Sequence, residues 1–253
     1  MMSSPLSENS TSAVAEIYDA FSSEYRNYSQ QKSRYISAVD DLIVDLFKGK
    51  SDRILDFGAG DGVRGVDLKQ RLKSDYLVQS DISSEMMARC EALGGADQVW
   101  GAQANWPETT APFDLIVCLW NVLGHVPDRQ SRVGTLKRLR SLMNAQGRLC
   151  FDVNNRHNRV YGKTRIVWRR IVDFIRPDER RGDAVFDWTI NGVVYPAYGH
   201  LFTFNELQKL LKDASLEIES WRSVDYLSGE VFNRVDRGHL FFVVKKMELE
   251  GES

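Results

Sequence analysis

The segment ILDFGAGDG, residues 54–62, decides the fold of this chain. A short apolar run that contains one acid leads into glycines at alternate positions, 58, 60 and 62. Glycine lets the backbone turn sharply and approach a ligand closely, because it has no Cβ. A strand followed by such a turn and then a helix is shared by several nucleotide-binding α/β proteins.

The glycine spacing argues against two of these classes. A dinucleotide fingerprint needs G-x-G-x-x-G, but Val63 stands where its last glycine would fall. A phosphate-binding P-loop ends in Gly-Lys-Ser or Gly-Lys-Thr, whereas residues 63–65 read Val-Arg-Gly. A tight turn without any ligand is the plain structural alternative.

Composition narrows the class of protein. Of 253 residues, 43% are hydrophobic and 27% charged, as in ordinary folded proteins, and the formal charge of -2 makes nucleic acid an improbable partner. Cys90, Cys118 and Cys150 are widely spaced, which predicts reduced core residues, no metal site and a cytoplasmic location. No apolar run approaches the ~18 residues of a membrane span, so no transmembrane segment is expected.

The rest of the chain alternates short apolar strands with amphipathic helices, which predicts an α/β fold. We expect a doubly wound, mostly parallel seven-stranded sheet with an antiparallel C-terminal hairpin at one edge. The expected strands are 53–57, 77–80, 98–101, 113–119, 148–153, 216–224 and 238–245, and the expected helices are 63–73, 84–93, 129–143 and 204–214.

The chain divides into four expected parts. These are a disordered tail at 1–12, a lid of two N-terminal helices at 13–50, a ligand-binding core at 51–154 and 203–246, and an inserted cap after the fifth strand at 155–202. The insertion should hold a basic amphipathic helix at 164–175 and a hairpin of strands 184–190 and 193–198. The apolar face of that helix fits packing on the core or contact with a membrane surface equally well.

Two acids accompany the glycine turn. Asp56 ends the strand before it, where its carboxylate can meet the cationic end of a ligand. Asp81 ends the next strand, where a carboxylate can accept hydrogen bonds from both hydroxyls of a ribose. The alternative for Asp81 is a cap for the helix that begins near residue 84.

The run DFGAGDG resembles the first motif of class I, seven-strand S-adenosylmethionine-dependent methyltransferases. Asp81 and segment 113–126 match later landmarks of that family, and the resemblance covers residues 50–154 well and 200–246 loosely. It implies a methyltransferase that converts S-adenosyl-L-methionine to S-adenosyl-L-homocysteine. The implied cofactor contacts are Asp56, Gly58, Ala59, Gly60, Asp81, Ile82, Leu119 and Trp120.

The adenine end departs from the family pattern. Ala102 or Gln103 stands where an acidic residue is common after the third strand. We therefore expect Gln103, Ala104 and Asn105 to supply the contacts to the adenine ring.

The acceptor is expected to be O or N of a small molecule, and the basic insertion fits an anionic one. His125 is the first candidate for a catalytic base and His200 the second, because imidazole titrates near neutral pH; a structural role is the alternative for both. Expected substrate contacts are Tyr18, Tyr25, Asn121, Asn154, Arg156 and Tyr198.

Several questions stay open at this level. The chain lacks the Asn/Asp-Pro-Pro-Tyr/Phe and Pro-Cys motifs of DNA methyltransferases, which also disfavours nucleic acid. A non-catalytic partner subunit that binds the cofactor, or a lipid- or quinone-type methyltransferase at a membrane surface, are the alternative functions. A nicotinamide oxidoreductase is disfavoured by the glycine spacing. The protein is expected to be a monomer or a homodimer.

Overall fold

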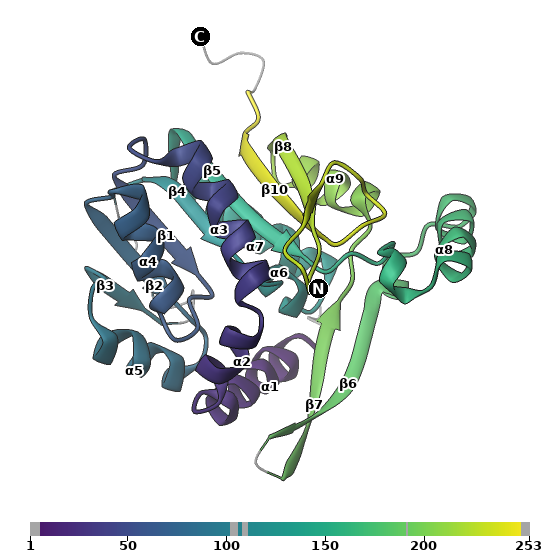
Figure 1. Cartoon of the computed structure of the whole chain (residues 1–253), viewed down its shortest axis with the longest axis horizontal. Coiled ribbons are helices and arrows are strands. Elements are labelled where there is room, and N and C mark those ends of the chain that lie inside the picture. Colours follow the sequence, from purple (N-terminus) through teal and green to yellow (C-terminus); the bar gives the residue numbers. More distant parts are fainter. Residues whose placement is uncertain (1–5, 102–105, 108–110, 191, 249–253) are drawn as a thin grey trace.

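The computed structural model describes residues 6–101, 106–107, 111–190 and 192–248 (Figure 1). The helices are α1 (Leu6–Phe21), α2 (Tyr25–Gln31), α3 (Ser33–Phe47), α4 (Val63–Leu72), α5 (Ser84–Leu93), α6 (Val122–His125), α7 (Arg129–Leu142), α8 (Lys163–Ile175) and α9 (Phe204–Asp213), with 3-10 turns η2 (Arg159–Tyr161) and η3 (Glu179–Gly182). The strands are β1 (Arg53–Phe57), β2 (Tyr76–Ser80), β3 (Gln98–Trp100), β4 (Phe113–Cys118), β5 (Met143–Val153), β6 (Asp183–Ile190), β7 (Val193–His200), β8 (Leu216–Val224), β9 (Val231–Phe232) and β10 (His239–Lys246).

The main sheet has the strand order β3-β2-β1-β4-β5-β10-β8-β9. The five strands from β3 to β5 are parallel, whereas β10 lies antiparallel between β5 and β8. The chain moves outward from β1 to β3 and then returns to place β4 on the other side of β1. In such open sheets a ligand binds beyond the carboxyl ends of the strands at this reversal, here between β1 and β4.

Alternate residues of the strands feed two separate cores. Leu55 and Ile116 belong to the core that α7 and α9 cover, whereas Ile54 and Leu115 belong to the core beneath α3 and α4. This is the alternation that a sheet with helices on both faces requires. The expected doubly wound fold is confirmed, and the three cysteines are buried and free.

The N-terminal helices and the insertion meet over the carboxyl end of the sheet. Hairpin β6–β7 lies beside α1 (Figure 1), and the two share a third apolar cluster. That cluster is built from the buried residues Ile17, Phe21, Ile190 and Ala197. Two segments that are far apart in the sequence, α1 and the hairpin, therefore form one cap.

The structure corrects several details of the expected elements. Over the described residues the main sheet has eight strands instead of seven, because the two-residue β9 pairs with β8. The N-terminal segment forms three helices instead of two, and α1 begins at Leu6, inside the stretch expected to be a disordered tail. Strand β5 begins at Met143, before the expected position 148. No helix of the described residues has the length and apolar character that crossing a membrane requires.

Candidate active site

The glycine turn joins β1 to α4 in a conformation that needs glycine. Gly58 and Gly60 have φ angles of 79° and 58°, in the left-handed region that other residues rarely adopt. A Cβ on Gly58 would lie 2.4 Å from Val122, and one on Gly60 would lie 2.5 Å from the Tyr25 hydroxyl. The turn therefore brings bare backbone to the end of the sheet.

Asp81 lies directly opposite this turn. One carboxylate oxygen accepts the backbone N–H of Gly60 at 2.8 Å, and the other accepts that of Ser83 at 3.0 Å. Burial raises the pKa of the Asp81 carboxyl, and these backbone donors partly offset the rise. The helix that follows is capped by Ser83, whose hydroxyl accepts the N–H of Met86, so the expected capping alternative for Asp81 is wrong.

A strained turn follows β4. Trp120 and Asn121 both have a φ of 63°, which is unusual for residues with a side chain. The buried carboxylate of Asp152, on β5, accepts the Trp120 N–H at 2.5 Å and the hydroxyl of Tyr35 from α3. The Asn121 side chain in turn accepts the N–H of Asn154 at 2.9 Å. Strain of this kind is held by surrounding structure and is frequent at functional sites.

These segments enclose a pocket of about 410 Å³, which we call the central pocket. It lies at the reversal of strand order, between the ends of β1, β2 and β4. Most of its lining is apolar or aromatic. The lining residues are Val14, Tyr18, Tyr25, Phe57, Gly58, Gly60, Ser80, Asp81, Ile82, Gly101, Leu119, Trp120, Val122, His125, Val126, Pro127, Ser131 and Thr135.

A second cavity of about 280 Å³, the aromatic chamber, shares Tyr18, Tyr25, Trp120 and His125 with the central pocket. Its remaining lining comes from α1, α2, the cap hairpin, the strained turn and the residues just after β5 and β8. These further residues are Phe21, Tyr28, Asn121, Asn154, Phe186, Trp188, Gly199 and Tyr226. Tyr28 stacks on Trp120 with ring centroids 5.6 Å apart, and Phe21 contacts Trp188 at 4.5 Å.

His125 stands between the two cavities. Its Nδ1 lies 3.0 Å from the backbone carbonyl of Tyr198, and its Nε2 lies 3.2 Å from the Tyr18 hydroxyl. Because a carbonyl only accepts, Nδ1 carries the proton, which leaves Nε2 as the acceptor of the Tyr18 O–H in the neutral ring. Burial lowers the pKa of His125 below its ordinary value of 6.5, so the ring is neutral at pH 7.

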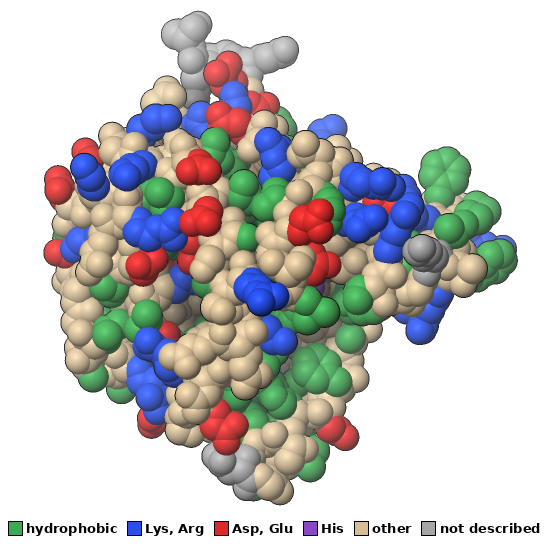
Figure 2. Space-filling view, in the orientation of Figure 1, with side chains coloured by type: hydrophobic (Ala, Val, Ile, Leu, Met, Phe, Trp, Pro, Cys, Tyr) green, Lys and Arg blue, Asp and Glu red, His purple; other side chains and the backbone are tan. Residues whose placement is uncertain are grey.

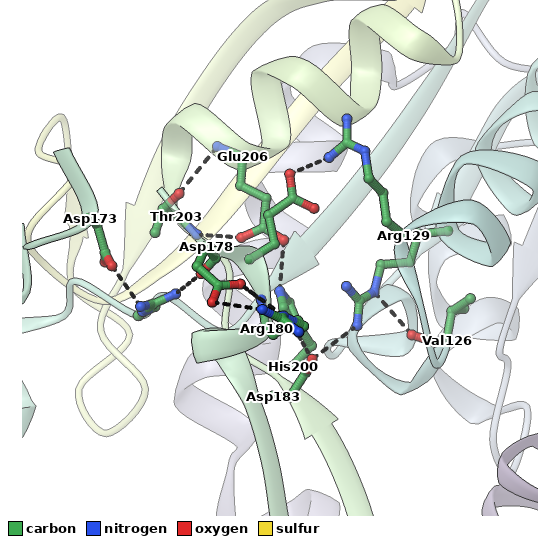
Figure 3. A network of polar contacts seen from close by, with 12 residues as sticks. Val126, Arg129, Asp173, Asp178, Arg180, Asp183, His200, Thr203 and Glu206 are labelled. Atoms are coloured by element: carbon green, nitrogen blue, oxygen red, sulfur yellow. Dashed lines mark hydrogen bonds and ion pairs between the residues drawn. The ribbon is translucent and has the colours of Figure 1, made fainter. Parts of the chain in front are cut away.

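Three expected site residues lie elsewhere. His200 is buried in a polar network, with Nδ1 2.6 Å from Asp183 and Nε2 2.7 Å from Glu206 (Figure 3). Arg156 pairs with Asp173 at 2.7 Å beside α8. Tyr198 offers His125 only its carbonyl, since its hydroxyl lies within hydrogen-bond distance of the Pro127 carbonyl, at 2.7 Å, and of the Asp183 carboxylate, at 2.6 Å. The structure does not bring these side chains to either cavity.

Asp56 and Ala59 line a neighbouring cavity of about 370 Å³ between α2, α3 and α4. The Asp56 carboxylate is buried and points toward Gly65, where an added Cβ would lie 2.4 Å from it. Burial raises the pKa of Asp56 to about 7 against the attraction of nearby Arg64. Gln103, Ala104 and Asn105 lie outside the described residues.

Sequence reasoning missed the aromatic contribution of the cap hairpin and the role of Asp152. Trp188 and Phe186 lie on β6, and the strand pattern gave no sign that they face the chamber. Asp152 lies within the expected strand 148–153, whose pattern assigns it no role. An acid at the end of a buried apolar strand is itself a signal, because burial without a hydrogen-bond partner is costly.

The central pocket fits S-adenosylmethionine. Its volume is in the range of ordinary ligand sites, about 300–1,000 Å³. The glycine turn leaves room at the backbone, and the Asp81 carboxylate is placed for ribose hydroxyls. Gly58, Gly60, Asp81, Ile82, Leu119 and Trp120 are the expected cofactor contacts that line it.

Comparisons with known proteins agree with this site. A family model for a methyltransferase domain matches residues 28–220, well over half of the chain. A glycine/sarcosine N-methyltransferase from Halorhodospira halochloris is 29% identical over 147 residues, which are 55% of this chain and 54% of that protein. The chain thus spans about half the length of this curated relative.

Solved structures share the fold across almost the whole chain. The DhpI-SAM-HEP complex has a TM-score of 0.64 at 20% identity, covering 96% of this chain and 100% of the other. CalS10, an amino pentose methyltransferase from Micromonospora echinaspora, has a TM-score of 0.58 at 13% identity, covering 88% and 96%. With the family match spanning the glycine turn, Asp81 and the cap hairpin, the chain belongs to the methyltransferase-domain family and is a class I S-adenosylmethionine-dependent methyltransferase.

Proposed function

We propose that this enzyme transfers the methyl group to the nitrogen of a small amine with a flat or apolar body. The observation that carries the proposal is the lining of the aromatic chamber. Over the described residues it contains eight aromatic rings of Phe, Trp and Tyr and no Lys or Arg. Aromatic faces attract ammonium groups and pack on flat or apolar bodies.

The charge of the neighbouring pocket supports the same substrate class. Among the described residues that line the central pocket, Asp81 is the charged one, and it is acidic. Arg156 and the other cations of the insertion lie away from both cavities. An amine therefore suits the site better than the anionic acceptor that the basic insertion had suggested.

S-adenosylmethionine held in the central pocket would supply an electrophilic methyl group. An in-line acceptor nitrogen would form the new N–C bond as the S–C bond breaks, with S-adenosylhomocysteine as the leaving group. An ammonium must first lose a proton, because its lone pair is needed for the new bond. The Tyr18 hydroxyl can accept that proton while it passes its own to Nε2 of His125, since it already donates to this nitrogen. Burial keeps Tyr18 protonated by raising its pKa.

The cap has two tasks in this proposal. Residues 13–50 act as a lid, and the insertion 155–202 selects the acceptor through the hairpin. Tyr18 and Tyr25 from the lid line both cavities, and Trp188 from the hairpin contacts Tyr18, Phe21 and Tyr28. Closing the cap aligns acceptor and donor and excludes water. The likeness to a glycine/sarcosine N-methyltransferase supports N-methylation.

The proposal is tested with cofactor that carries a deuterated methyl group. The purified chain is offered matched pairs of small molecules, each an amine and its hydroxyl counterpart, with and without an added carboxylate. Mass spectrometry should find the deuterated methyl group on the amines. Amines that also carry a carboxylate should take up less of it than amines without one. Label confined to hydroxyl compounds would overturn the proposal. Cofactor binding without any product would instead favour the non-catalytic partner subunit.

A further inference from the structure

Helix α8 projects from the body of the molecule (Figure 1), and several of its apolar side chains are exposed to solvent. Soluble proteins rarely expose a contiguous apolar patch of this kind without a use for it. The outward side chains are Val167 (59% exposed), Trp168 (67%), Ile171 (45%), Phe174 (85%) and Ile175 (67%). We call this set the α8 face.

The α8 face is one continuous stripe. Positions 167, 171, 174 and 175 follow helical spacing, with 168 beside them, so they share one side of the helix. The opposite side is fixed to the protein. Ile166 is buried, and Asp173 is held by Arg156 at 2.7 Å and by His157 at 2.9 Å. The helix cannot turn its apolar side inward without breaking these contacts.

Cations border the α8 face on both sides. Helical spacing puts Arg165 and Arg176 along one side and Arg170 along the other, and all three are exposed. Figure 2 shows hydrophobic side chains at the outer end of α8 with Lys and Arg side chains beside them. The single acid of the helix, Asp173, is already paired on the inner side.

From this arrangement we infer that α8 docks the enzyme on a membrane surface rich in anionic lipid. An apolar stripe enters the boundary between headgroups and acyl chains, while flanking Arg side chains reach the phosphates. A second copy of the chain fits less well, because pairing two α8 faces would bring their Arg borders together. The inference concerns where the enzyme acts and does not depend on the acceptor.

The test is co-sedimentation of the purified full chain with vesicles. Vesicles of phosphatidylcholine alone are compared with vesicles of phosphatidylcholine and phosphatidylglycerol, at low and high salt. We expect binding to the anionic vesicles, and weaker binding at high salt because ions screen the Arg contacts. F174E and I171E should each weaken binding by about tenfold or more, since each replaces an apolar side chain that the bilayer would bury with a charged one.

Matched control variants test whether vesicle binding depends on the α8 face or on any exposed apolar residue. L227E alters an equally exposed apolar residue, 71% exposed, outside α8 and should bind like the wild type. W168F should keep binding but lose the blue shift of tryptophan emission on vesicles, which remains informative if F174E and I171E fold poorly. No binding to the anionic vesicles, or equal binding to both vesicle types, would overturn the inference of docking on anionic lipid. Self-association in light scattering that F174E abolishes would overturn it in favour of a second copy.

Discussion

At the scale of single residues, the Asp81 carboxylate joins the glycine turn to the end of β2. We expect D81N, which keeps the shape but removes the charge, to raise the Kd for S-adenosylmethionine about tenfold to a hundredfold. The reason is that a hydrogen bond to a charged group contributes roughly 1.5–3 kcal/mol. Isothermal titration calorimetry measures this directly.

Asp75 provides the matched control, because it is exposed just before the opposite end of the same strand. D75N should leave the Kd unchanged. An unaltered Kd in D81N would mean that Asp81 only organises the turn.

From the role proposed for His125 we predict how the activity of the enzyme changes with pH. The neutral ring accepts the proton, and burial lowers its pKa below 6.5. Activity should therefore hold constant as pH falls to 6.5 and decline only below it, as the ring becomes protonated. H125N should lose most of kcat and, with it, this acidic limb.

The measurement is kcat/KM against pH for the wild type and two variants. H157N is the control, since His157 pairs with Asp173 beside α8, far from the chamber lining. The same acidic limb in H125N as in the wild type would assign it to another group.

At the scale of elements, we expect the cap hairpin to contribute to acceptor binding through Trp188. We expect W188A to raise KM for the acceptor about tenfold, because aromatic pairs contribute about 0.5–1.5 kcal/mol each beyond their buried area and Trp188 contacts several rings. The Kd for the cofactor should stay within twofold, since Trp188 does not line the central pocket.

V185A, at a position 75% exposed on the same strand, tests whether any change to β6 has this effect. Comparable losses of acceptor and cofactor affinity in W188A would show that the hairpin supports the whole site instead of the chamber.

The elements themselves were largely predictable from the sequence. Strand β8 has the bounds that its pattern predicts, Leu216–Val224, and α9 begins at the expected residue 204, after a capping box of Thr203 and Glu206. Apolar periodicity and helix caps are local sequence patterns, so they predict helices and strands without knowledge of tertiary contacts. Strand β9 was missed because two residues carry no periodicity, and pairing with β8 alone defines them.

The faces of the cap hairpin were not predictable. Tyr198 and His200 share one side of β7 and both contact Asp183, whereas Ala197 and Gly199 face the α1 cluster and the chamber. Side chains alternate along a strand, so a one-residue shift of the pattern exchanges the two sides. Both strand faces carry aromatic residues here, and only packing against α1 decides which side points inward.

At the scale of the whole molecule, the pKa of His239 should make the free energy of unfolding depend on pH. Its ring stacks on Tyr226 at 4.7 Å and contacts Tyr35, and burial lowers its pKa to about 4. Between pH 6.5 and 4 the unfolded chain binds a proton that the folded chain does not, so the free energy of unfolding falls. The loss should reach about 3 kcal/mol near pH 4.

Urea unfolding at several pH values measures this as the difference between the wild type and H239Q. The comparison between the two proteins is needed because Asp56 has the opposite effect. Its pKa is raised to about 7, so protonation of Asp56 increases the free energy of unfolding as the pH falls. Above pH 6.5 the free energy of unfolding should change with pH in the same way in the wild type and in H239Q. A constant difference down to pH 4 would contradict the assignment.

The Asp152 carboxylate has a consequence for the evolution of the family. It receives the Tyr35 hydroxyl from the N-terminal helices and the backbone N–H at position 120 from the strained turn. A relative that replaces the acid loses the partner of the hydroxyl, so positions 35 and 152 should change together. Position 120 contributes only backbone to this contact, so a change of its side chain would leave the contact intact while it alters the wall of the chamber.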